Sequence, residues 1–305
     1  ISRKVRSALE AKKNAGEYYT PRTIVKLMVM LMDPKPGDTV YDPACGTGGM
    51  LIEAIRHIGD KQMTYGRIYG QENNLSTSAI ARMNLFLHGA SDFKVAQGDT
   101  LRTPKFIEHG QLQKFNCVLA NPPFKGSLDA ESVSANLLKM CKTRKTELLF
   151  LTLFIRILQV GGRCACIVPD GVLFHSGKEG DIREQLIKSD LIEAVVALAG
   201  GVFYGTGVSA CILFLNNQKR PEHKGKVCLI DATNIYTPKR AQNVMEEKDI
   251  NEVFKLYQEY KDVIEKCKIV SIADLDAAGN TLAVNTRGCC SRNSKSTIFR
   301  SIGKC

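Results

Sequence analysis

Short apolar runs alternate with longer amphipathic segments from residue 39 to residue 198, and this alternation restricts the fold more than any other feature of the chain. Apolar runs of this kind predict buried strands, and the segments between them have helical length and periodicity. The expected strands are Thr39–Tyr41, Arg67–Gly70, Phe93–Ala96, Asn116–Leu119, Arg163–Val168, Leu191–Leu198 and Ser209–Leu215. This order predicts an α/β fold with a doubly wound, mostly parallel seven-stranded sheet.

Helices are expected between most of these strands, at Arg22–Met32, Met50–His57, Ser76–Leu87, Glu147–Leu158 and Lys178–Lys188. At the start of the first helix, Thr20 and Pro21 fit the N-cap and the first helical position. Only a glycine-rich loop joins the last two strands. We therefore expect these two strands to form an antiparallel pair at one edge of the sheet.

Three regions are expected along the chain. Residues 1–33 are interpreted as an N-terminal helical segment with a loop, residues 34–217 as the α/β catalytic domain and residues 218–305 as a C-terminal extension. Within the extension, the pattern predicts a strand at Val227–Asp231 and an amphipathic helix at Asn251–Lys266, whereas the tail from Asn285 onward is polar and basic without periodicity. The chain begins at Ile1 in what resembles the middle of a helix, so we expect a fragment of a longer protein.

The charge balance favours a polyanionic partner. The 305 residues have a formal net charge of +11 and a sequence pI of about 9.1. An excess of this size is typical of proteins that bind nucleic acid. The alternative is a basic surface without such a partner, because the lysines and arginines are scattered and form only modest clusters.

Cysteine and histidine usage predicts a cytoplasmic protein without a metal site. The 11 cysteines include no Cys-x-x-Cys spacing, and many lie within apolar runs, as small core residues do. This usage fits a reducing compartment, and the five histidines are dispersed. No secretory signal is visible, and the longest apolar stretch, Leu148–Leu158, is too short to span a bilayer.

One strand ends in groups that suit an aromatic amine. The apolar run Cys117–Ala120 stops abruptly at Asn121-Pro122-Pro123-Phe124. The Asn121 carboxamide oxygen and a backbone carbonyl can each accept one N–H of an exocyclic amine. Two prolines limit the backbone geometry, and Phe124 can stack on a flat heterocycle. The alternative is a plain turn after a strand, which Asn-Pro-Pro also signals.

Three other strands also end in polar residues. The first runs into Asp42-Pro43-Ala44-Cys45-Gly46-Thr47-Gly48-Gly49. These glycines allow a ligand close to the backbone, but Leu51 stands where the dinucleotide-binding fingerprint requires its third glycine. Asp42 offers negative charge to a cationic ligand. The glycine turn alone is weak evidence for a cofactor site.

The next two strands end in Gln71-Glu72-Asn73 and in Gly98-Asp99-Thr100. Glu72 is well placed to accept from both hydroxyls of a ribose, and Asp99 can accept from an adenine amino group. Each acidic residue alone could be a helix cap or a solvated charge. Four polar strand ends in succession favour a nucleoside-containing cofactor, because ligands bind beyond the carboxyl ends of the strands in open α/β sheets.

These segments together resemble the modification (methylation) subunit of type I restriction–modification systems, a family of S-adenosylmethionine-dependent N6-adenine DNA methyltransferases. The matching segments are Glu17–Arg22, Asp42–Gly49, Gln71–Asn73, Gly98–Thr100, Asn121–Phe124, Val168–Phe174 and Gly201–Val208. The resemblance covers roughly residues 15 to 265. It implies a Rossmann-like S-adenosylmethionine-dependent methyltransferase fold.

The resemblance also implies the roles of matched residues. Asn121, Pro122, Pro123 and Phe124 would bind the target base and are the expected catalytic residues. Glu72 would bind the cofactor ribose and Asp99 its adenine. The full set of expected cofactor-binding residues is Glu17, Tyr18, Tyr19, Thr20, Pro21, Arg22, Asp42, Pro43, Cys45, Gly46, Thr47, Gly48, Gly49, Glu72, Asn73, Asp99 and Thr100.

The partners implied are double-stranded DNA with a flipped adenine, a DNA-specificity subunit, and a restriction or translocase subunit. Residues 217–305 are too few for a sizeable sequence-reading domain, so specificity is expected to reside in another chain. Three features depart from the family pattern. The N-terminal helical domain is absent or nearly so, Ala199-Gly200 replaces a frequent proline, and the tail from Asn285 matches nothing in the family.

Two alternatives remain open at the level of sequence. The first is a methyltransferase that modifies another amine, such as a protein glutamine or cytosine N4, because these groups fit the same Asn-Pro-Pro-aromatic cup. Phe124 in place of Tyr and the upstream Tyr-Thr-Pro element argue against it. The second is a catalytically silent assembly module in a DNA-binding complex. The second alternative is disfavoured because the residues expected to bind the cofactor and the target amine are all present, namely Asp42, Glu72, Asp99 and Asn121.

Overall fold

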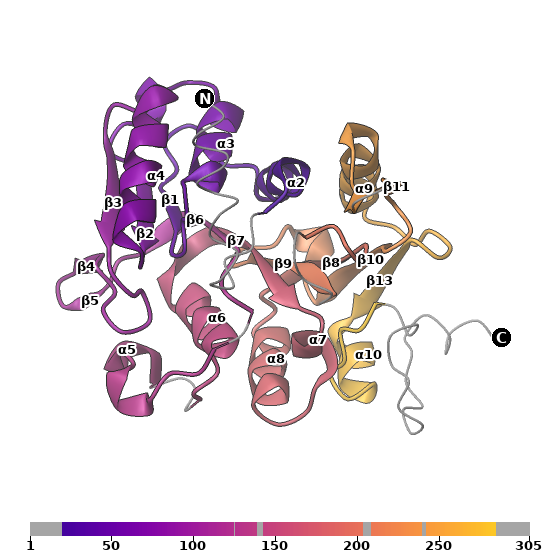
Figure 1. Ribbon diagram of the computed structural model, residues 1–305. Coiled ribbons are helices and arrows are strands. Elements are labelled where there is room, and N and C mark those ends of the chain that lie inside the picture. Colours follow the sequence, from indigo (N-terminus) through magenta and orange to yellow (C-terminus); the bar gives the residue numbers. More distant parts are fainter. Residues whose placement is uncertain (1–19, 125, 139–142, 204–208, 240–241, 285–305) are drawn as a thin grey trace.

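The computed structural model describes residues 20–124, 126–138, 143–203, 209–239 and 242–284, and one large sheet organises them (Figure 1). Its strands are β1 (Val40–Asp42), β2 (Ile68–Glu72), β3 (Phe93–Gln97), β6 (Phe115–Ala120), β7 (Leu158–Pro169), β8 (Ile192–Leu198), β9 (Ala210–Asn216), β10 (Lys226–Ala232) and β13 (Cys267–Ser271). They lie in the order β13-β10-β8-β9-β7-β6-β1-β2-β3. Two small antiparallel pairs stand apart, β4 (Ile107–Glu108) with β5 (Gln111–Leu112) and β11 (Thr237–Pro238) with β12 (Asn243–Val244).

Helices cover both faces of this sheet, which gives three layers (Figure 1). One face carries α2 (Arg22–Met32), α3 (Gly49–Ile58), α4 (Leu75–Leu87) and α9 (Glu247–Glu259). The opposite face carries α5 (Ala135–Leu138), α6 (Thr146–Ile157), α7 (Gly171–Phe174), α8 (Lys178–Lys188) and α10 (Ile272–Ala277). Short 3-10 helices lie at Gln62–Thr64, Ala130–Ser132 and Pro221–His223.

The expected mostly parallel α/β sheet is confirmed, but the sheet is larger than the expected seven strands. Strand β10 pairs in parallel with β8, and β13 pairs antiparallel with β10, which makes nine strands. The pair β8–β9 is antiparallel as expected, yet it lies inside the sheet rather than at its edge. The physical reason is β10, whose apolar residues 227–230 are all buried and cover what would otherwise be the free edge of β8.

One predicted helix needs correction at both of its ends. The helix expected at Asn251–Lys266 begins at Glu247 and ends at Glu259. Its start is fixed by a reciprocal cap in which Glu246 and Asp249 each accept from the other's backbone N–H, and its end by Tyr260 in the left-handed conformation. Residues 1–19 of the expected N-terminal helical segment and the tail from Asn285 lie outside the described residues.

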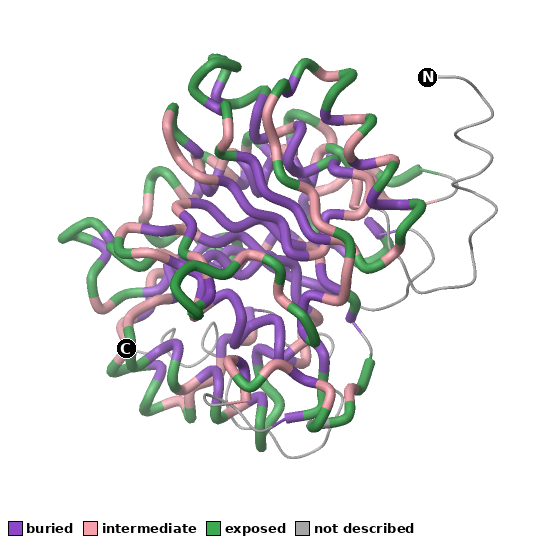
Figure 2. The backbone as a smooth tube through the Cα atoms, turned by 90° about the vertical axis from the view of Figure 1, so that its left-hand side faces the viewer, coloured by how far each residue is buried: buried purple, intermediate pink, exposed green. Residues whose placement is uncertain are grey.

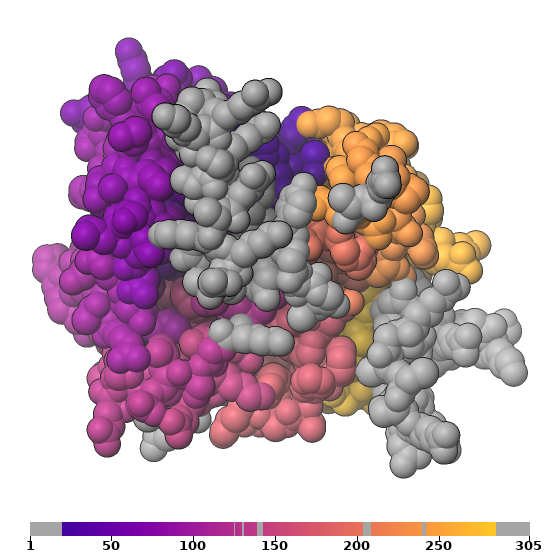
Figure 3. Space-filling model, viewed as in Figure 1, coloured from indigo at the N-terminus to yellow at the C-terminus, as the bar shows by residue number. Residues whose placement is uncertain are grey.

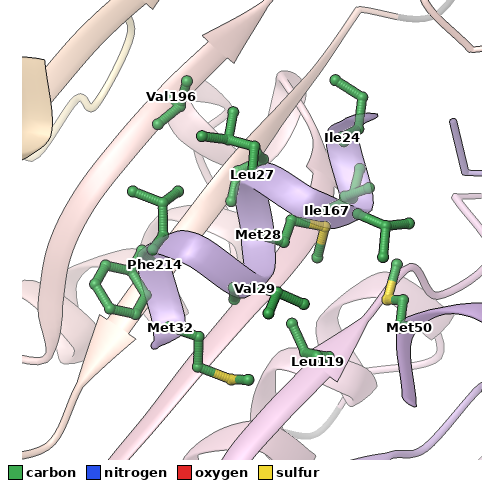
Figure 4. Close-up of a cluster of buried hydrophobic side chains, with 14 of the residues drawn as sticks. Ile24, Leu27, Met28, Val29, Met32, Met50, Leu119, Ile167, Val196 and Phe214 are labelled. Atoms are coloured by element: carbon green, nitrogen blue, oxygen red, sulfur yellow. The ribbon is translucent and has the colours of Figure 1, made fainter. Parts of the chain in front are cut away.

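Helix α2 is anchored across the middle of the sheet by one apolar face. Ile24, Leu27, Met28 and Met32 are at most 1% exposed. Figure 4 shows these side chains packed among Met50 of α3, Leu119 of β6, Ile167 of β7, Val196 of β8 and Phe214 of β9. On the outer side, Lys26 of α2 pairs with Glu247 of α9, and Figure 3 shows α2 beside the orange segment that contains α9. The helix is therefore held on both sides.

Strand β6 is buried on both faces of the sheet. Its residues Cys117 and Leu119 pack toward the layer of α2 and α3, whereas Val118 and Ala120 pack toward the layer of α6, and all four are 0% exposed. Figure 2 shows the central strands as continuously buried. A strand buried in this way has one allowed register, because a slip of one residue would exchange its two faces.

No helix in the described ranges is long and apolar enough to cross a membrane.

An aromatic cluster supports the start of β6. The Phe115 ring is 1% exposed and stacks on Tyr41 with ring centroids 4.5 Å apart. Tyr69 meets the same ring edge-on at 5.1 Å, and Phe106 meets it at 6.3 Å. The cluster thus ties β6 to β1, to β2 and to the loop after β3.

We predict that Phe115→Ala lowers the free energy of unfolding by about 3–5 kcal/mol, because it removes a fully buried ring and leaves a cavity. Urea unfolding followed by circular dichroism measures the change. Phe86→Ala is the matched control, since Phe86 is 71% exposed and should shift the value by only about 0.5 kcal/mol or less. Equal losses in both variants would contradict this account of the core.

Candidate active site

The strand order brings the polar strand ends to one edge of the sheet. Strands β6, β1, β2 and β3 are neighbours and all parallel. Their carboxyl ends therefore lie side by side. Asp42 and Glu72 are the last residues of β1 and β2, and Asn121 and Asp99 follow the ends of β6 and β3 within two residues. The structure thus places the four predicted site segments together, as expected for a ligand site of a parallel α/β sheet.

The glycine turn after β1 is a tight backbone loop that packs on β2. Cys45 N–H donates to the Gln71 carbonyl at 3.0 Å, and Gly48 N–H donates to the Cys45 carbonyl at 2.8 Å. Gly46 and Gly48 have φ values of 53° and 83°, which only glycine adopts without strain. From the far side, the Asn84 side chain donates to the Thr47 carbonyl at 3.0 Å, and α3 then begins at Gly49.

Glu72 joins this turn to the end of β2. Its Oε2 accepts from Gly46 N–H at 3.0 Å, and its Oε1 accepts from Asn74 N–H at 2.8 Å. The neighbouring Asn73 is exposed, and its carbonyl accepts from the Gln97 side chain at 2.8 Å. Two backbone contacts fix the orientation of the Glu72 carboxylate. Such a group has about four acceptor positions in all, so these contacts are compatible with additional hydroxyl donors.

The segment after β3 is held by its own side chains. Asp99 Oδ1 accepts from the N–H groups of Leu101 and Arg102 at 2.9 and 3.2 Å, and Asp99 Oδ2 lies 3.3 Å from Arg102 Nε. The buried Thr100 hydroxyl donates to the Pro43 carbonyl at 2.6 Å. These contacts connect the loops after β3 and β1. The predicted contacts of Asp99 and Thr100 with a cofactor stay predictions.

The Asn121 carboxamide is held by a residue far away in the sequence. Its Nδ2 donates to Thr20 Oγ1 at 2.8 Å. The prediction that Thr20 caps α2 is wrong: Pro21 occupies the N-cap position, and no described side chain caps this helix. Thr20 faces the end of β6 instead, because the anchored α2 brings its first residues there. Arg22, at the start of α2, is exposed.

Phe124 is packed into the protein rather than exposed. Its side chain is 5% exposed and meets the ring of Phe203 edge-on, with centroids 6.2 Å apart and planes at 82°. Pro122 is also buried, whereas Pro123 is exposed. Stacking of Phe124 on a base stays a prediction. The predicted site residues Glu17, Tyr18 and Tyr19, and residues 204–208 of the glycine-rich loop, lie outside the described residues.

Comparison with known families identifies the family of this chain. The family model described as N-6 DNA Methylase matches residues 5–294. The chain belongs to the N-6 DNA methylase family. The match covers the glycine turn, the acidic strand ends and the Asn-Pro-Pro-Phe segment.

Curated relatives of this methylase chain are type I restriction enzyme methylase subunits. The MjaVIII subunit of Methanocaldococcus jannaschii is 34% identical over 283 residues, which cover 87% of this chain and 48% of the relative. The EcoKI subunit of Escherichia coli K12 is 34% identical over 224 residues, which cover 68% of this chain and 42% of the relative. The chain thus spans about half the length of these relatives.

Solved structures agree with this similarity. The type I restriction-modification methyltransferase subunit from Streptococcus thermophilus matches with a TM-score of 0.81 at 27% identity, over 92% of this chain and 61% of that one. A modification subunit of a putative type I restriction enzyme from Vibrio vulnificus matches with a TM-score of 0.75 at 30% identity, over 89% of this chain and 59% of that one.

The site residues predicted from the sequence do not include Gln71, which supports this edge of the sheet. Its side chain is fully buried and donates from Nε2 to the carbonyls of Gly98 and Thr103 at 3.1 and 3.0 Å. Its Oε1 accepts from Lys105 N–H at 3.0 Å. Gln71 thus fixes the loop that carries Asp99 onto β2. The sequence shows only that an amide precedes Glu72, and this does not reveal the role of Gln71.

Asp42 of the methylase chain is a buried carboxyl with an altered acidity. It is 2% exposed, and burial raises its pKa to about 8, while the hydrogen bond from Ala44 N–H lowers the pKa and the nearby Glu72 raises it further. A protonated Asp42 is therefore favoured near neutral pH when no cation is close. Within the described ranges, no three His, Cys, Asp or Glu side chains gather as metal ligands.

We predict that this carboxyl makes stability depend on pH. The native state binds the Asp42 proton up to about pH 8, whereas the unfolded chain releases it near the ordinary pKa of 3.8. Stability contributed by this group is therefore fully present below about pH 4 and is lost as pH rises toward 8. Thermal unfolding of the ligand-free protein between pH 5 and pH 8 should show a steeper fall for wild type than for Asp42→Asn. Parallel curves would contradict the buried, protonated carboxyl.

Proposed function

We propose that this chain is the methyltransferase part of a modification subunit that transfers a methyl group from S-adenosylmethionine to N6 of adenine in double-stranded DNA. The observation that carries the proposal is the position of the Asn121 carboxamide. It lies directly after the end of β6, it is hydrogen bonded to Thr20, and the buried Pro122 follows it. It lies on the same sheet edge as the glycine turn and Glu72. Membership of the N-6 DNA methylase family supports the same reaction.

The residues present fit S-adenosylmethionine. Glu72 is oriented by two backbone N–H groups and would accept from the ribose hydroxyls, as expected at the end of the second strand. Apart from its chain neighbours, no described atom lies within 4 Å of the position that a Cβ would occupy at Gly46, so the turn is open to close approach of the ligand there. Asp42 would place a carboxylate near the positive charge of the ligand. Asp99 would accept from the adenine. When bound, the cofactor supplies a methyl group activated by a sulfonium.

The chain's own residues then prepare the amine. The Asn121 carboxamide oxygen and the Pro122 carbonyl would accept the two N6 protons of the target adenine. These contacts turn the nitrogen lone pair out of conjugation with the ring and direct it at the methyl group. Phe124 would stack on the base. N6 would become positively charged as it takes the methyl group, and this would make one of its protons acidic enough to leave to solvent. Catalysis therefore rests on alignment and fixed dipoles rather than on a strong base.

The substrate and partners follow from the same chemistry. The N6 amine is unreachable within a duplex, so the adenine must be flipped out of the stack. The net charge of +11 suits contacts with phosphates, which position the duplex without reading its sequence. Sequence choice is therefore assigned to a separate DNA-specificity subunit, and a restriction or translocase subunit is the further partner. The EcoKI and Streptococcus thermophilus relatives, as type I subunits, support this assembly.

The compartment that suits this reaction is the cytoplasm. The described cysteines are buried free thiols, namely Cys45, Cys117, Cys164, Cys166, Cys211, Cys228 and Cys267. Unpaired thiols in such numbers suit a reducing environment. Cellular DNA is also the substrate that the proposed reaction requires.

We predict that Asn121→Ala reduces methyl transfer to DNA by on the order of 10²-fold or more, because it removes a positioned acceptor that acts in the transition state. Transfer of a labelled methyl group from S-adenosylmethionine, by the full-length protein with its specificity subunit, measures the loss. Binding of S-adenosylmethionine, measured by calorimetry, should persist. Asn251→Ala is the matched control, since Asn251 is exposed on α9 and should leave turnover unchanged.

The labelled product separates the rival functions. Label in N6-methyladenine supports the proposal, whereas label in N4-methylcytosine or in protein glutamine assigns another amine as substrate. Near-normal turnover by Asn121→Ala would overturn the role of the carboxamide. A wild-type protein that binds the cofactor and DNA but labels nothing would be an assembly module.

A further inference from the structure

The hydrogen bond between Thr20 and Asn121 joins two segments that the sequence treats separately. Thr20 lies 101 residues before Asn121, and its Oγ1 accepts from Asn121 Nδ2 at 2.8 Å. The resemblance to known modification subunits assigns Thr20 to the cofactor, and its sequence context assigns it to a helix cap. The described contact of its hydroxyl is with the Asn121 amide, and no described side chain caps α2.

Both ends of this hydrogen bond are anchored. Thr20 directly precedes α2, whose buried face includes Ile24 at 1% and Leu27 at 0% exposure, packed across the centre of the sheet (Figure 4). Asn121 directly follows β6, whose last residues Leu119 and Ala120 are 0% exposed. Neither segment can move without disturbing the core. The Thr20 hydroxyl is therefore a fixed reference point for the amide.

The orientation of the Asn121 amide decides what it offers to a ligand. The terminal torsion of an asparagine side chain is soft and roughly two-fold, so packing alone sets it weakly. With Nδ2 directed at Thr20, the carboxamide oxygen is directed away from Thr20. An oxygen is the atom that can accept a proton of an amine, whereas an NH₂ group in its place offers only donors.

We propose that Thr20 is a positioning residue for methyl transfer, which orients the Asn121 carboxamide toward the amine of the target base. The inference rests on the proposed function and deepens it. It separates Thr20 from the residues that hold the cofactor. The two roles differ in their kinetics: a residue that orients Asn121 acts on kcat, whereas a residue that holds the cofactor acts on its Kd and KM.

Three variants test the role in the full-length protein with its specificity subunit. Thr20→Val keeps the shape but removes the acceptor, and Thr20→Ser keeps the hydroxyl. Thr23→Val is the matched control, because Thr23 lies one turn along on α2 and its side chain makes no hydrogen bond with the described residues. The measurements are kcat and KM for methyl transfer to DNA, the Kd of S-adenosylmethionine by calorimetry, and the thermal midpoint of each variant.

The proposal predicts that Thr20→Val lowers kcat by about 10- to 100-fold, the effect expected of a misplaced catalytic group. Its KM for DNA and its Kd for the cofactor should stay within about twofold of wild type. Thr20→Ser should recover kcat to within about threefold, and Thr23→Val should match wild type. An unchanged cofactor Kd also shows that the Thr20→Val protein is folded.

Other results overturn the proposal in distinguishable ways. A weaker cofactor Kd with normal kcat would assign Thr20 to cofactor binding, and unchanged constants would leave it without a role. If kcat falls equally in Thr20→Val and Thr20→Ser, or if Thr20→Val unfolds, Thr20 has a packing role instead. If wild type itself transfers no methyl group to adenine, the proposed function fails and this inference falls with it. If the wild type is active and Thr20→Val is active as well, the inference about Thr20 fails while the proposed function stands.

Discussion

The site depends on strand β6 being buried on both faces at the centre of the sheet. Val118 and Leu119 point into opposite apolar layers, so the strand has one register and ends at one place. Asn121 directly follows this end, and the prolines after it restrict the backbone further. The anchored α2 then brings Thr20 to the same point. A soft amide side chain is thereby held by two rigid elements.

The neighbouring strand ends form a connected network rather than separate contacts. Gln71 ties the loop after β3 to β2, Glu72 ties the glycine turn to β2, and Thr100 ties the loop after β3 to Pro43. Side chains thus hold the loops in place around the ends of β1, β2 and β3. The buried Asp42, with its pKa raised by burial, lies within this network and adds a charge that depends on its surroundings.

The sequence predicts features that arise from local patterns and fails where distant segments decide the outcome. Apolar runs and polar strand ends predict the parallel sheet and the edge that carries Glu72 and Asn121. The role of Gln71 depends on carbonyls delivered by a separate loop, so no local pattern reveals it. Thr20 before Pro21 has the local pattern of a helix cap, yet a partner 101 residues away takes its hydroxyl. The apolar pattern predicts the strand that forms β10, but its place beside β8 depends on pairing that the pattern does not encode.

The proposed reaction is methylation of N6 of adenine in DNA. It can be tested by single-molecule sequencing of DNA from cells with and without the full-length protein, each with the specificity subunit. We expect N6-methyladenine at one recurring split motif only when the protein is present. Identical DNA in both cells, or N4-methylcytosine in place of N6-methyladenine, would contradict it.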